Sequence, residues 1–143
     1  MSSEANKALV RHFLQVVEQG DLESAAEMLS PTLKVHLAGA PSPLDRASFM
    51  QFGKMWHGAF PDEQSTIEDQ IAERDSVVTR LAGTATQTGA FQGLPATGKQ
   101  IRVTAIWIDR IADGKIVERW SQFDQLGVMQ QLGIIPMPEQ TDA

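Results

Sequence analysis

The sequence predicts a single α+β domain, in which N-terminal helices cover a strongly curved antiparallel sheet and enclose an apolar pocket. Apolar residues recur at helical spacing in three segments of the first sixty residues, and they alternate with polar ones from about 65 to 124. The dipeptide Asp113-Gly114 between two alternating runs is a strong signal for a tight hairpin. Helices followed by hairpin-connected strands are typical of an α+β domain. The domain is expected to span residues 1–143, with a short polar tail from about 134.

Three helices are expected before the sheet. The first carries an apolar stripe from Ala5 to Val17, with a serine cap before it and Gly20 after it. Asp21 caps a second, shorter helix over 22–29, which Ser30-Pro31 closes. A short strand is expected over 33–38, and Asp45 then opens a third helix that ends before Pro61.

The remaining chain reads as strands and one last short helix. The alternating segments are 66–73, 77–88, 101–112 and 115–124, separated by polar turns. The helix follows over 126–132. Gly83, Gly89 and Gly93 offer places at which such a sheet can bend.

Composition excludes several classes of function. A net charge of −6 without a basic cluster gives no electrostatic footprint for nucleic acid. The absence of cysteine excludes thiolate chemistry and Cys-based metal sites, and no histidine pair has ligand spacing, so we expect no metal site and no cofactor. No apolar run is long enough to span a membrane and no secretory signal begins the chain, so a cytoplasmic protein is expected.

Counting outward from the Asp113-Gly114 turn gives a register for the last hairpin. A regular two-residue turn sets Trp107 opposite Trp120. One face of the hairpin then holds six residues, Val103, Ala105, Trp107, Trp120, Gln122 and Asp124. Desolvation on such an apolar face would raise the pKa of the aspartate and make it a usable general base or acid.

Two alternatives stay open at this point. The same register sets Asp109 opposite Glu118, a repulsive pair, whereas a bulge would let Arg110 meet Glu118 and would change the face that Asp124 takes. Spacing alone also favours Asp124 as the N-cap of the following helix. The histidine at position 36 has the parity opposite to its apolar neighbours, so it faces either the pocket or water.

In several ordered segments the chain resembles the SnoaL-like polyketide cyclase family, within the folds similar to nuclear transport factor 2. The segments are the helical opening with Gly20-Asp21, AFPD (59–62), TGAFQGLPATGK (88–99) and, as the strongest, DRIADGKIVERWSQFDQLGVMQQLG (109–133). The resemblance implies a cone of curved sheet closed by helices. It further implies aldol-type ring closure without metal or covalent intermediate, in which an aspartate matched by Asp124 removes the acidic proton.

The chain departs from that family pattern at two positions. Gln87 stands where many relatives have a histidine, and Trp107 occupies a strand position in which histidine is common. Gln87 and His36 are predicted to orient or polarise the carbonyl group. The predicted walls of the substrate site are Phe52, Trp56, Phe60, Trp107, Trp120 and Gln122.

The sequence therefore favours a cofactor-independent, cyclase-like enzyme that acts on a small hydrophobic, polyketide-like or aromatic carbonyl compound. Isomerisation, dehydration or hydrolysis in the same pocket is one alternative, and a non-catalytic small-molecule binding protein is another. Open sheet edges and an exposed outer face predict a homodimer or a higher homo-oligomer.

Overall fold

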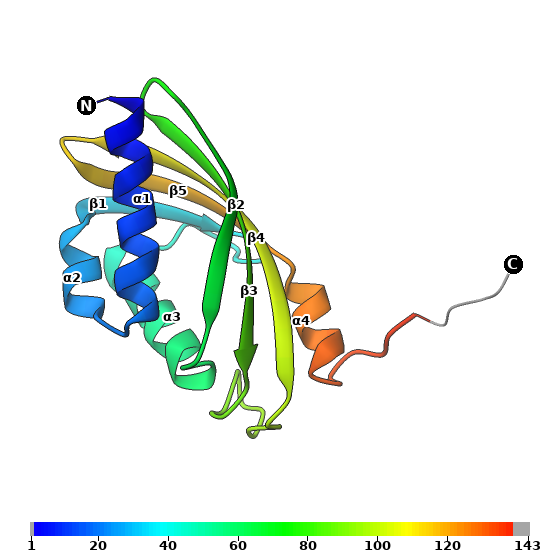
Figure 1. Ribbon diagram of the computed structural model, residues 1–143. Coiled ribbons are helices and arrows are strands. Elements are labelled where there is room, and N and C mark those ends of the chain that lie inside the picture. The colour runs from blue at the N-terminus through cyan, green and yellow to red at the C-terminus, as the bar shows by residue number, and fades with distance from the viewer. Residues whose placement is uncertain (1, 139–143) are drawn as a thin grey trace, which may run out of the picture.

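The computed structural model describes residues 2–138, in which three helices pack on one side of a curved five-stranded sheet (Figure 1). A fourth helix follows the last strand and lies apart from the other three (Figure 1). The elements in chain order are α1 Ser3–Glu18, α2 Leu22–Glu27, β1 Leu29–Leu37, α3 Arg46–Ala59, β2 Gln64–Glu73, β3 Ser76–Thr86, β4 Gln100–Ala112, β5 Lys115–Phe123 and α4 Gln125–Gln131. The predicted α+β class is confirmed.

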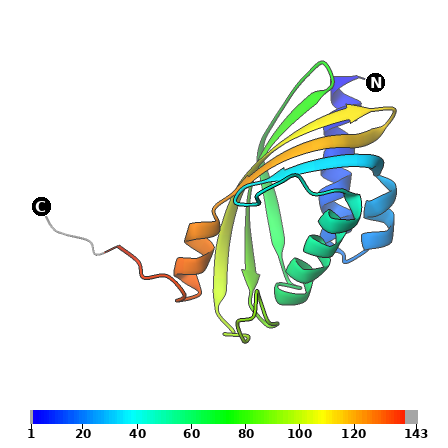
Figure 2. The same ribbon diagram turned by 180° about the vertical axis from the view of Figure 1, so that it is seen from behind.

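The strands are ordered β1-β5-β4-β3-β2, so the pairs from β2 to β5 form a meander of consecutive antiparallel strands. The first strand pairs with β5 in parallel, which the sequence analysis did not anticipate. Figure 2 shows β1 and β5 side by side at one edge of the sheet. A parallel pair needs a crossover, and here α3 and the meander provide it.

Side-chain caps define the starts of the helices. The Ser2 hydroxyl accepts a hydrogen bond from the amide of Ala5 at 3.1 Å, and Asp21 accepts one from Ser24 at 3.1 Å. These bonds satisfy amides that have no partner inside the helix. After α1, Gly20 adopts a φ of +77°, a conformation that glycine takes without the steric cost of a side chain.

The second helix is shorter than predicted. It ends at Glu27, and β1 begins at Leu29, so Ser30-Pro31 lies inside a strand and does not close a helix. Leu29 pairs with Ile116 of β5, and the register shifts between Leu29 and Lys34. A proline is tolerated there because β1 is an edge strand, in which an outward-facing position need not donate a ladder hydrogen bond.

Buried apolar residues form two clusters on the helical side of the sheet. One cluster joins α1, α2 and β1 to the turn end of the β4–β5 hairpin, around Val10, Phe13 and Ile116. The other joins the end of α3 to α4 and to the loop after β3, around Phe60, Phe91 and Val128. Within residues 2–138 no helix combines the length and the apolarity needed to cross a membrane. The predicted tail begins after α4; residues 134–138 form no helix or strand, and 139–143 lie outside the described residues.

Candidate functional site

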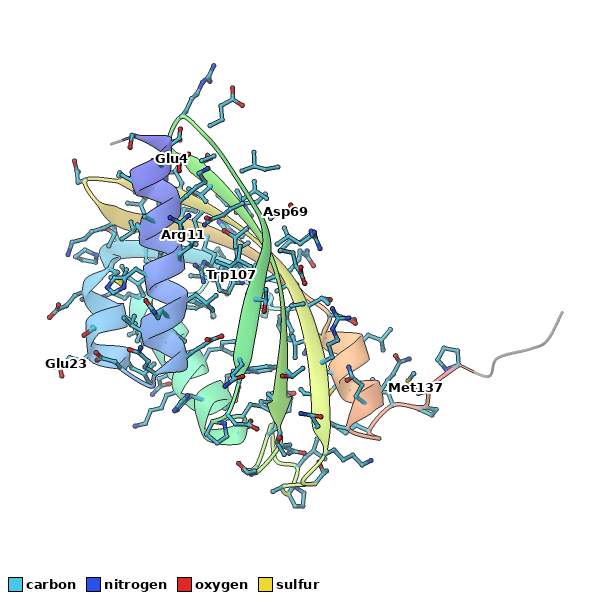
Figure 3. The ribbon with its side chains drawn as sticks, viewed as in Figure 1. Glu4, Arg11, Glu23, Asp69, Trp107 and Met137 are labelled. Atoms are coloured by element: carbon cyan, nitrogen blue, oxygen red, sulfur yellow. The ribbon has the colours of Figure 1, made fainter. Side chains whose placement is uncertain are left out.

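A cavity of about 160 Å³ lies between α1, α3 and the inner face of the sheet, where strands β2 to β5 contribute to its wall. Its lining is mostly apolar, and Figure 3 shows Trp107 in the space between α1 and the strands. A dry cavity of roughly 150 Å³ accepts a benzene ring, so this cavity has the size of an aromatic group.

The third helix supplies one wall. Phe52, Trp56 and Phe60 line the cavity, as does Trp107 on β4, so these four predicted wall residues do come together. The indole of Trp56 packs against Phe60 with ring centroids 4.5 Å apart and against Phe123 at 5.8 Å. Contact with substrate stays a prediction for all four.

The cavity wall also contains a carboxyl group that the sequence analysis did not single out. Glu63, between α3 and β2, is partly buried; its Oε2 accepts a hydrogen bond from the indole Nε1 of Trp56, and its Oε1 accepts one from the Ser65 hydroxyl at 3.3 Å. Burial raises the pKa of Glu63, the indole bond opposes that shift, and the neighbouring charge of Glu18 adds to it. A carboxyl with a raised pKa is a stronger base once ionised.

Two further titratable side chains line the cavity near Glu63. Glu18, at the end of α1, accepts a hydrogen bond from the amide of Ser65 at 2.7 Å. His57 on α3 also lines the cavity and favours the ionised form of Glu63 electrostatically. Two carboxylates and an imidazole in one wall form a group that can take up, hold and release a proton.

At another part of the wall, Arg119 on β5 forms an ion pair with Asp109 on β4. Its Nε donates to Oδ1 at 2.6 Å and its Nη2 to Oδ2 at 3.1 Å. Burial raises the pKa of Asp109, and the attraction of the guanidinium opposes that shift. Such a pair is held firmly, because either charge alone would be buried without compensation.

The register of the last hairpin corrects the predicted inner face. A bulge between Arg110 and Ile111 sets Arg110 opposite Glu118 and Ile108 opposite Trp120, so the bulged alternative is the correct one. Inner positions on β5 are therefore Arg119, Ser121 and Phe123, which line the cavity. The prediction that Trp120, Gln122 and Asp124 share the inner face with Trp107 is wrong, since all three are exposed.

Asp124 caps α4. Its Oδ1 accepts a hydrogen bond from the amide of Gly127 at 2.9 Å, and the carboxyl lies outside the cavity wall. The geometry favours the capping interpretation that the sequence left open. A catalytic role for Asp124 stays a prediction, and the cavity geometry does not support it.

Replacing Asp124 tests the two roles directly. We expect Asp124→Asn to retain ligand conversion and Asp124→Ala to lower the free energy of unfolding by about 1 kcal/mol through loss of the cap. Thermal unfolding and turnover assays of both variants measure these effects. Loss of turnover in the asparagine variant, with unchanged stability, would restore Asp124 as the base.

His36 and Gln87 also lie away from the cavity wall. The imidazole of His36 stacks on Trp120 at a centroid distance of 5.0 Å, and its Nε2 lies 2.7 Å from Glu118 Oε2. Gln87 is fully buried, and its amide holds the loop after β3: Nε2 donates to the carbonyls of Gly89 and Pro95, and Oε1 accepts from Thr97. The structure thus does not bring the three predicted catalytic residues together.

Sequence reasoning missed Glu63, Glu18 and Arg119. The first two belong to different elements that meet only in the fold, and no periodicity marks them. Arg119 would have been found by choosing the bulged register, for which the repulsion between Asp109 and Glu118 was the signal.

The fold places the protein among the α+β domains whose architecture is similar to nuclear transport factor 2, and its cavity lies between the helices and the curved sheet. The chain belongs to the SnoaL-like polyketide cyclase family, whose profile matches residues 7–132. This match confirms the family resemblance drawn from the sequence.

Known relatives extend that result. The chain is 30% identical over 131 residues to the aklanonic acid methyl ester cyclase DnrD of Streptomyces peucetius, covering 87% of this chain and 88% of that protein. The structure of AclR from Streptomyces galilaeus, a candidate hydroxylase, is similar with a TM-score of 0.89 and 27% identity, covering 97% of this chain and 87% of that one. IdmH from Streptomyces antibioticus, a candidate polyketide cyclase, has a TM-score of 0.80 and 29% identity, covering 90% and 98%.

Proposed function

We propose that the protein is a cyclase-like enzyme that transfers a proton from a hydrophobic carbonyl compound of polyketide type, with Glu63 as the general base. The observation that carries the proposal is a carboxyl of raised pKa in the wall of an apolar cavity. The kinship with DnrD and the family membership support a polyketide-like substrate.

The proposed reaction needs only a positioned base and an enforced substrate shape. Ionised Glu63 removes a proton from a carbon between two carbonyl groups, and the resulting enolate forms a carbon–carbon bond to a second carbonyl of the same molecule. The proton then passes from Glu63 to the new alkoxide, which leaves a ring alcohol. The aromatic walls of the cavity would hold the substrate in the folded conformation that ring closure requires, because an extended substrate would not fit.

Deuterium exchange tests the proton-transfer step without knowledge of the natural substrate. An aryl 1,3-diketone incubated with the protein in D₂O should lose its signal from the acidic C–H faster than in buffer containing an equal concentration of free acetate. NMR follows both this exchange and any ring closure. A ligand that raises the melting temperature yet exchanges at the buffer rate would instead support a non-catalytic binding protein.

We further propose that a second copy of the chain covers the outer face of the sheet. Cross-strand register joins Ile71, Val78, Ile108 and Trp120 into one row across four strands. Ile71 is 67% exposed, and Ile108 and Trp120 are each 40% exposed. An apolar row of this kind on a sheet surface is typical of a subunit interface.

A charge on that row is expected to separate the subunits. Ile108→Glu should shift the protein from dimer to monomer in sedimentation analysis, because the carboxylate would be buried without a partner. Leu126→Glu is the matched control, since Leu126 is 56% exposed on α4, outside the row. A monomeric parent protein, or equal dissociation of both variants, would contradict this interface.

A further inference from the structure

The Arg119 guanidinium is buried, yet Asp109 uses only part of it. The side chain of Arg119 is 3% exposed, and that of Asp109 is fully buried. A guanidinium carries five N–H donors in a planar fork. Asp109 takes the Nε–H and one N–H of Nη2, so both donors of Nη1 and the second donor of Nη2 remain.

The Nη1 donors belong to a residue of the cavity wall. Arg119 belongs to the cavity wall, and no hydrogen bond within residues 2–138 uses its Nη1. Among the described residues, the one fully enclosed side-chain polar atom without a partner is Asn6 Oδ1. The Nη1 group is therefore not fully enclosed by neighbouring atoms, and the cavity is the space that Arg119 lines.

Aromatic rings fix the orientation of the free edge. The Arg119 Cζ lies 4.0 Å from the ring centroid of Trp107, 4.9 Å from that of Phe13 and 5.8 Å from that of Phe49. With Asp109 on one edge and rings around it, the guanidinium has little freedom to turn. A preoriented cation in a site with little water binds an anion more strongly than an exposed side chain does.

We propose that the free edge of Arg119 is a subsite for a planar anion with two oxygen atoms, either a carboxylate or the enolate of a 1,3-dicarbonyl group of the ligand. The Nη1–Nη2 edge offers two parallel N–H donors, which match two oxygens on one plane. This inference rests on the proposed function only in that it places the ligand in the same cavity.

The subsite and Glu63 belong to different cross-strand rows of the sheet. Asp109 pairs with Arg119, whereas Ser65, which bonds to Glu63, lies in the row of Gly83 and Val103. Six residues of β4 separate the two rows, and the side chains of Arg119 and Glu63 line the same cavity. A ligand that engages both side chains would be an aromatic or polyketide-like compound with its anionic group beside Arg119 and its acidic C–H toward Glu63.

Two probes with the same ring system test the subsite on the unaltered protein. 2-Naphthoate and its methyl ester differ in charge and in the second free oxygen, and quenching of tryptophan fluorescence reports their binding beside Trp107. We expect the carboxylate to bind at least tenfold more tightly than the ester. Equal affinity, or tighter binding of the ester, would overturn the proposal.

A naphthyl 1,3-diketone separates the two anion classes. If its affinity rises as the pH passes through its own pKa, the subsite accepts enolates as well as carboxylates; if its affinity stays constant, the subsite accepts carboxylates alone. Either result supports a two-oxygen subsite provided that naphthoate is preferred over the ester.

Paired substitution removes the subsite without leaving a buried charge. In Arg119→Met/Asp109→Leu the preference for naphthoate should vanish, and a retained preference would place the anion elsewhere. Glu63→Gln should keep the preference while losing deuterium exchange. Exchange without an anion preference would therefore reject the subsite alone, and an anion preference without exchange would reject the proton-transfer proposal alone.

Discussion

Glu63→Gln is expected to reduce deuterium exchange and turnover by roughly 10²- to 10⁴-fold, the contribution typical of a positioned general base. The amide keeps the size of the side chain and can still accept the indole hydrogen bond of Trp56. Ligand affinity and the fold should therefore persist. NMR exchange assays and fluorescence titration of the same preparation measure the two quantities.

Glu18→Gln is the matched control for this variant. It removes a neighbouring carboxylate that raises the pKa of Glu63, but it leaves Glu63 in place. We expect the Glu18 variant to remain active, with its pH–rate profile moved toward lower pH. Equal loss of activity in both variants would assign the chemistry to the pair and not to Glu63 alone.

The stability of the Glu63 variant should depend on pH in a defined direction. The pKa of Glu63 is raised in the folded protein, so folding favours the protonated form of this carboxyl. The free energy of unfolding of the parent protein therefore falls as the pH rises and Glu63 ionises. Glu63→Gln mimics the protonated form. The variant should therefore unfold at a higher temperature than the parent at pH 7, and this difference should disappear below the unfolded pKa, near pH 4.

Removing Arg119 alone is expected to lower the free energy of unfolding by about 3–5 kcal/mol, because Asp109 would be left buried without a counter-charge. Arg119→Met keeps a similar apolar stem, so the loss isolates the charge and its hydrogen bonds. Urea unfolding of the parent and the variant measures the difference.

The double variant Arg119→Met/Asp109→Leu should recover most of that loss. Replacing a buried ion pair by apolar residues of similar volume is often neutral. This recovery makes the double variant suitable for the ligand tests. If its loss of stability instead equalled the sum of the losses in the two single variants, the two side chains would act independently.

Long periodic segments were predictable from the sequence. Apolar stripes and caps marked α1 and α3, and alternation with turn signals marked β2 to β5. The parallel pairing of β1 was not predictable, because periodicity within a strand does not identify its neighbour. The end of α2 was also missed, since the Ser30-Pro31 signal that suggests a helix end also occurs in an edge strand.

The site was less predictable than the fold, for two physical reasons. Side chains alternate between the two faces of a strand, so one bulged position decides the face of every β5 residue. A regular turn without the bulge predicts Trp120 inward and Arg119 outward, the reverse of the observed arrangement. In addition, Glu63 gains its chemical character from Trp56, Ser65 and Glu18, which lie on separate elements. Such an environment exists only after folding.

The alternation along β4 and β5 has a consequence for experiments on either surface. Trp107 lines the cavity and Ile108 points outward, and on β5 the inward Ser121 lies between the outward Trp120 and Gln122. The ligand compartment and the external face therefore share a wall that is a single strand layer thick. A substitution made on the outer face to disturb assembly should therefore also be assayed for small-molecule affinity. A substitution made in the cavity should likewise be assayed for subunit association, because the same strands carry the residues of both surfaces.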